Sequence, residues 1–271
     1  MVKIAHKTFF DMGWEKYLTV LFLLLGIGFF SSGSVTWVAA NWDYLSKFQK
    51  LYATQGLLGL TTVSAVFFYI KEAKRLPKAR LKFISASFFF ASAVLIGTLF
   101  ALIGQIYQTG ADPWQLFALW SILQIPLLLI LPNIGSVLLL MLTLNVTVVL
   151  YGVYHNDFMP EFLIGLNFLL LVIIEFTSDF FHDKHWRVLS KCANLALAFS
   201  LMAWIVDEIS VSYMGQSVSG FSCLVFGGLI WVYKKYRNDL FPLIVHFIGL
   251  IVSLDISILS RDFFDIKKIA T

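Results

Sequence analysis

Long apolar blocks, six of them free of charged residues, alternate along this chain with short polar turns. Nine blocks are long enough to form helices that cross a bilayer, which takes about 20 apolar residues for roughly 30 Å of hydrocarbon. Only helices and closed barrels satisfy every backbone N–H and C=O in lipid, so the pattern predicts an all-α, polytopic transmembrane bundle of nine spans. The expected spans are Tyr17 to Ala40, Leu51 to Ile70, Phe83 to Tyr107, Trp114 to Leu131, Ile134 to Tyr154, Phe162 to Ser178, Val188 to Val206, Gly215 to Tyr233 and Leu240 to Ser260.

The composition supports this class and excludes a soluble domain. Hydrophobic residues make up 59% of the 271 positions and charged residues only 13%, whereas a soluble domain carries about 25% charged residues. The longest polar stretch, KEAKRLPKARLK, has 12 residues, so no soluble domain is expected. The two cysteines, Cys192 and Cys223, each lie within an apolar block and are interpreted as packing residues.

The distribution of lysine and arginine predicts how the chain is threaded. Basic loops stay on the cytoplasmic side, and KEAKRLPKARLK alone holds 6 of the 20 basic residues. Alternation from this loop puts the N-terminus in the cytoplasm, with 15 basic residues inside and 5 outside. The tail after Ser260 falls outside, unless the last span is re-entrant. The net charge of +4 is therefore attributed to topology, and no nucleic-acid partner is expected.

Two corners combine polar and aromatic residues where an apolar block meets a turn: Trp37 to Leu45 and Leu102 to Trp120. In the second corner, Gly110 suits a tight turn and Asp112 suits the cap of the following helix. Tyr107 and Trp114 fit an aromatic belt at the headgroup level, which needs no ligand. The functional alternative places the amides of Asn41 and Gln105 in a polar pocket near the outer surface.

The first four spans suggest a tandem repeat of two helix pairs. A shift of 64 positions lays Asn41 on Gln105 and Gly33 on Gly97. Gly97 and Gly104 are seven residues apart, so they share one helix face, where two backbones can approach closely. The repeat is expected at the level of hydropathy, because few identities support it.

The two corners resemble those of the domain of unknown function 2157 family of bacterial multipass membrane proteins, over about residues 15–150. This resemblance implies a bacterial inner-membrane location and no reaction. It also separates a family-like membrane domain at residues 1–150, with spans one to five, from further helices at residues 151–271. Ala111, between Gly110 and Asp112, departs from the pattern. The matching positions are Asn41, Trp42, Gly104, Gln105, Ile106, Tyr107, Gly110, Asp112, Trp114, Trp120 and Pro126.

Three ionisable residues, Glu175, His246 and Asp255, lie deepest in apolar surroundings. A charge there costs about 2.5 to 3.5 kcal/mol on insertion scales, so these residues are candidates for a proton or ion path. His246 and Asp255 are nine residues apart, which is about 13.5 Å along a helix, so each needs a partner elsewhere.

No motif for common hydrolytic or nucleotide chemistry is present in the sequence, and no cofactor is expected. The run DFFHDKHW, at 179–186, has spacings that could hold a divalent metal, but a polar juxtamembrane loop is the preferred interpretation. The sequence favours a non-enzymatic membrane component that acts with a membrane-protein partner. The alternative is a small-solute or ion transporter that uses Glu175, His246 and Asp255.

Overall fold

The computed structural model describes residues 44–75, 83–107, 110–155, 159–181, 187–211, 215–237 and 239–269. The chain forms two compact units, residues 1–53 and residues 54–271, and each is treated by itself. The first expected span, Tyr17 to Ala40, lies outside the described residues, as do Asn41 and Trp42.

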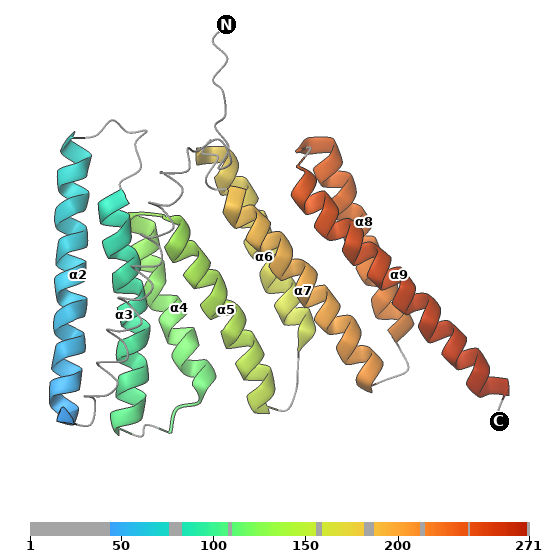
Figure 1. Cartoon of the computed structure of the whole chain (residues 1–271), viewed down its shortest axis with the longest axis horizontal. Helices are drawn as coiled ribbons and strands as arrows, with labels where there is room; N and C mark the ends of the chain where they lie inside the picture. Colours follow the sequence, from blue (N-terminus) through green and yellow to red (C-terminus); the bar gives the residue numbers. More distant parts are fainter. Residues whose placement is uncertain are drawn as a thin grey trace, which may run out of the picture. The chain divides into compact units, whose positions relative to one another are not determined.

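The described residues fold into eight α-helices and contain no strand, which confirms the all-helical class (Figure 1). Six of these helices, α2 to α7, are long and apolar enough to cross a membrane. In α9 the apolar part, Leu240–Ile256, is shorter. The total of nine spans and the tandem repeat stay predictions. The helices are α2 (Lys47–Arg75), α3 (Phe83–Tyr107), α4 (Pro113–Ile130), α5 (Ile134–His155), α6 (Pro160–Phe181), α7 (Arg187–Val211), α8 (Gly215–Tyr236) and α9 (Leu240–Ile269).

Local signals explain where several helices begin. Ser46 and Gln49 form a reciprocal capping box at the start of α2, with each side chain accepting from the other residue's backbone N–H at 3.2 and 2.8 Å. Proline occupies the first position of α4 and of α6, where its missing N–H costs nothing. Pro126 lies inside α4, as expected, and the helix continues through it to Ile130.

The largest buried apolar cluster centres on α7. Four of its members, Leu189, Ala193, Leu197 and Leu201, recur every four residues and therefore form one face of that helix. The face packs against α5, α6 and α8 through Met141, Leu171, Ile174 and Phe226. Many large apolar side chains elsewhere are exposed, as a lipid-facing surface requires.

Helices α3 and α4 meet at a close contact between Gly97 and the ring of Trp120. A Cβ added at Gly97 would lie 2.3 Å from the ring, so the contact requires glycine. The indole Nε1 of Trp120 also donates a 2.7 Å hydrogen bond to the carbonyl of Ala93. Of the two glycines expected on a close helix face, only Gly97 makes such an approach, because no atom lies within 4 Å of the position for a Cβ at Gly104.

A carboxylate of α2 caps the start of α3. Glu72 accepts hydrogen bonds from the backbone N–H groups of Ile84 and Ser85 at 3.3 and 3.4 Å, and from the Ser85 hydroxyl. The first N–H groups of a helix lack partners within the helix and carry partial positive charge, so a carboxylate stabilises them.

Candidate functional site

The corner between α3 and α4 holds an open pocket of about 780 Å³. Gly110 turns the chain there with a φ of 64°, a left-handed conformation that glycine adopts without strain, which confirms its expected role. Four of the predicted site residues line the pocket, namely Gly104, Gln105, Gly110 and Asp112. Its other lining residues are Phe100, Ala101, Ile103, Ala111, Pro113, Gln115, Leu116 and Leu119.

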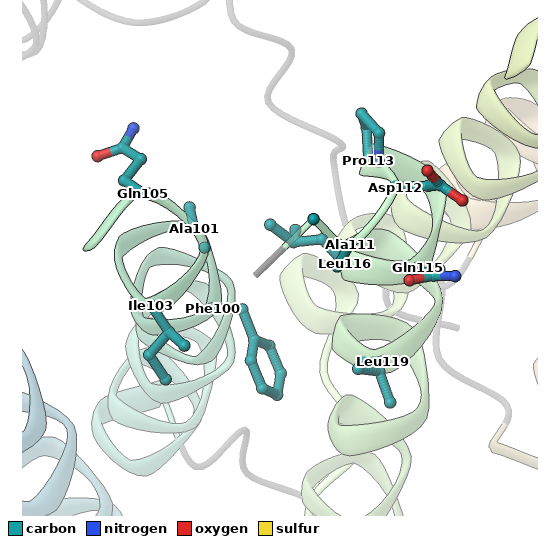
Figure 2. A pocket seen from close by; sticks show the side chains of 12 residues that line it. Phe100, Ala101, Ile103, Gln105, Ala111, Asp112, Pro113, Gln115, Leu116 and Leu119 are labelled. Atoms are coloured by element: carbon teal, nitrogen blue, oxygen red, sulfur yellow. The ribbon is translucent and has the colours of Figure 1, made fainter. Parts of the chain in front are cut away.

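The centre of this pocket is apolar, and the polar side chains of its lining residues point away from it. Figure 2 shows Phe100 and Leu116 projecting into the space between α3 and α4. In the same view, Gln105 extends beyond the end of α3, whereas Asp112 and Gln115 point to the far side of α4. Gln105 is exposed, and Asn41 lies outside the described residues, so the paired-amide pocket stays a prediction.

Asp112 occupies the N-cap position of α4, but its carboxylate makes no capping hydrogen bond. The expected side-chain cap is therefore wrong. Only the backbone carbonyl of Asp112 takes part, accepting from the N–H of Gln115 at 3.0 Å. The carboxylate interacts instead with Tyr154 of α5.

The two aromatic residues of the corner differ in burial. Tyr107 is 55% exposed at the end of α3, as an interfacial aromatic residue would be. Trp114 is half-buried, and its ring meets that of Tyr151 edge to face at 5.1 Å. Trp114 therefore also contributes to the packing of α4 against α5.

A second polar assembly links α6, α7, α8 and α9, and Glu175 of α6 is its acceptor. The guanidinium of Arg237 lies 2.9 Å from Oε2 of Glu175, and the hydroxyls of Tyr233 (2.7 Å) and Ser190 donate to Oε1. Glu175 is partly buried, with 21% of its side chain exposed, so its charge is stabilised by groups that can donate to it. Arg237, Tyr233 and Ser190 are such groups, because each can donate a hydrogen bond to a carboxylate.

The assembly continues to His246 through Asn194. The Asn194 amide N–H donates to the carbonyl of Ser190 and to the hydroxyl of Tyr233, both at 2.8 Å. A carbonyl can only accept, so the amide oxygen of Asn194 must face Nε2 of His246, 2.6 Å away. Nε2 therefore carries a proton. His246 thus donates to Asn194, Asn194 donates to Tyr233, and Tyr233 donates to Glu175. Hydrogen bonds that run in one direction polarise one another, which strengthens each of them.

Asp255 does not join this assembly. Nine residues separate it from His246, and at about 100° per residue this places the two on opposite faces of α9. His246 is fully buried, together with Pro242, Gly249 and Ser253, whereas Asp255 is exposed. The structure thus brings together two of the three ionisable residues singled out in the sequence, Glu175 and His246.

The cavity beside Glu175 is small, about 20 Å³, which is room for a single water molecule. The arrangement is suited to holding charges and joining helices, and it is too small for an organic substrate. No group of three or more His, Cys, Asp and Glu side chains that could hold a metal occurs among the described residues. Most of the run DFFHDKHW lies outside them. The cavity is lined by Glu175, Arg187, Ser190, Tyr233, Arg237 and Asp239.

Comparison with known proteins adds one finding. No curated protein and no solved structure matches this chain. Residues 6–135 match the model of the family DUF2157, described as a predicted membrane protein. The matched segment contains both corners and extends through α4. The chain is therefore a membrane protein with several helices able to span a bilayer, and its residues 6–135 are similar to the DUF2157 family.

Proposed function

We propose that this protein is a non-enzymatic membrane component that binds a partner protein at the pocket between α3 and α4. The occupant is an apolar transmembrane helix of that partner, with a basic residue at its end. The family resemblance supports a bacterial inner membrane as the protein's location. The basic loops support an N-terminus in the cytoplasm and this pocket on the opposite side.

The pocket itself carries the proposal. An apolar centre formed by Phe100 and Leu116, with the polar Gln105 at its edge, has the organisation of a protein interface. Elsewhere, polar side chains inside the bundle are largely bonded to one another, for example Asn145 to Asn167 and Ser121 to Thr143. The pocket is where an apolar surface and the corner residues occur together.

Charge complementarity favours a basic partner. The sequence from residue 83 to residue 183 contains no lysine or arginine, while Asp112 and Glu161 lie at the starts of α4 and α6. A negative potential at one end of the helices attracts a positively charged segment and disfavours an acidic one.

Photo-cross-linking in intact membranes tests this proposal. A photoreactive residue at Leu116, inside the pocket, is expected to cross-link one protein whose labelled segment is an apolar helix with a basic end. The matched control is Leu129 on the same helix, which is 80% exposed and outside the pocket lining, and should label lipid only. Ala101→Trp fills the pocket and should abolish the protein cross-link. Labelling of residues 17–40 of the same chain, or of lipid alone at both positions, would contradict the proposal.

A second candidate is proton or ion transport that uses Glu175 and His246, favoured by the continuous hydrogen-bonded series between them. Asn194 limits this function, because its amide oxygen and nitrogen do not readily exchange a proton between them. Liposomes that contain the wild type or His246→Gln, followed with a pH dye while candidate cations are varied, test it. Flux from the wild type that the variant lacks would favour transport, and equal flux or none would exclude His246.

A further inference from the structure

Four aromatic rings gather where α4 begins and α5 ends. Trp114 and Tyr151 meet edge to face at 5.1 Å, and Tyr151 lies 4.1 Å from the ring of His155. Tyr154 meets His155 edge to face at 5.2 Å. Tyr151 and Tyr154 are 37% and 55% exposed, so the cluster is open at the surface.

The polar groups around these rings are mainly hydrogen-bond acceptors. The carboxylate of Asp112 interacts with Tyr154, which places a negative charge beside the exposed rings. Nδ1 of His155 lies 2.9 Å from the carbonyl of Tyr151, and a carbonyl can only accept, so Nδ1 carries the proton.

The backbone adds to this negative character. His155 is the last residue of α5, and the final carbonyls of a helix carry partial negative charge that favours a cation. No lysine or arginine competes from the surrounding sequence, since residues 83–183 contain none. Ring faces, a carboxylate and helix carbonyls all favour the same kind of ligand, an alkylammonium ion.

We propose that Asp112, Trp114, Tyr151, Tyr154 and His155 bind the ammonium group of a zwitterionic lipid headgroup. The position of the cluster favours a lipid over a free amine, because it lies at the ends of two apolar helices, where headgroups meet the protein. An aromatic belt alone explains the rings and does not require the carboxylate. This inference shares only Asp112 with the pocket proposed for the partner, so the test includes a variant outside that pocket.

Lipid retention by the purified full-length protein tests the inference. The protein is taken from nanodiscs that contain equal phosphatidylethanolamine and phosphatidylglycerol, and bound lipids are counted by native mass spectrometry. The wild type should retain phosphatidylethanolamine preferentially, and Asp112→Asn should lower that preference about tenfold. The matched control, Asp255→Asn, removes an exposed carboxylate from α9 and should keep the preference.

Two further arms make the result decisive. Tyr154→Leu removes a ring that does not line the pocket between α3 and α4, so its effect is separable from loss of the partner, and it replaces Asp112→Asn if that variant fails to fold. Free ethanolamine added at millimolar concentration should not displace the lipid, and displacement would assign the site to a soluble amine. Equal preference in the wild type, Asp112→Asn and Tyr154→Leu would overturn the inference.

Discussion

The side-chain amides of Asn145 on α5 and Asn167 on α6 bond to each other in both directions. The nitrogen of Asn145 lies 3.1 Å from the oxygen of Asn167, and the nitrogen of Asn167 lies 2.8 Å from the oxygen of Asn145. Asn167 is almost fully buried. The pair therefore favours one register of the two helices, since a shift by one residue would separate the buried amide of Asn167 from its partner.

A double-mutant cycle on this pair should reveal coupling. Asn145→Ala and Asn167→Ala are each expected to lower the free energy of unfolding, and the double variant should lose less than the sum. The expected coupling is about 0.6 kcal/mol and at most about 1.7 kcal/mol, the range for hydrogen bonds between transmembrane helices. Thr177→Ala is the control, because that hydroxyl bonds only within its own helix. Additive losses in detergent unfolding would contradict the reciprocal geometry.

Gly97→Ala should destabilise the contact between α3 and α4. The new methyl group would lie 2.3 Å from the Trp120 ring, and such overpacking costs about 1 to 3 kcal/mol. Gly104→Ala is the matched control on the same helix and should change stability by less than about 0.5 kcal/mol. Adding Trp120→Phe to Gly97→Ala should recover part of the loss in a thermal unfolding assay. A silent Gly97→Ala would show that the ring can move aside.

Glu175 and Asp255 should respond differently to the same chemical change. Glu175→Gln removes the charge that pairs with Arg237 and should lower stability by about 2 kcal/mol. Asp255→Asn should stay within about 0.5 kcal/mol, because the carboxylate is exposed on the opposite face of α9 from His246. Unfolding in mild detergent measures both. An Asp255 variant as damaged as the Glu175 variant would show that Asp255 has a buried partner.

Reporter fusions test the threading. A fusion after Ala79 should report the cytoplasm and one after Asp112 the opposite side, because six basic residues hold the connecting loop inside. Alkaline phosphatase and green fluorescent protein, which are active on opposite sides, give complementary readouts. The reverse pattern would invert the whole arrangement, including the side assigned to the pocket.

Sequence reasoning located the helices because apolar blocks directly indicate their length. Phe83–Tyr107 begins and ends as expected, and Ile134 begins α5 as expected. The expected helix bounds were wrong where a helix begins or ends in polar residues. The helix α9 continues past Ser260 to Ile269, since charged residues are compatible with a helix once it leaves the apolar layer. At the start of α2, the capping box of Ser46 and Gln49 was a signal that the apolar pattern did not include.

The polar contacts could not be predicted in the same way. A helix that is apolar all round gives no indication of which face is buried, so the partners of Asn194 and Tyr233 depend on how the helices are rotated in the bundle. Simple geometry does separate His246 from Asp255, because nine residues make two and a half turns. The apolar centre of the corner pocket was also missed, since the sequence pattern marks the polar corner residues, and two of these, Asp112 and Gln115, point to the far side of α4.

The pairing of Glu175 with Arg237 affects the order in which this protein can be completed during synthesis. The two residues are 62 positions apart, and translation proceeds at about 5 to 20 residues per second. For about 3 to 12 seconds, therefore, Glu175 enters the membrane without its cation. During this interval α6 and α7 await α8, so we expect the nascent chain to stay associated with the insertion machinery until Arg237 emerges.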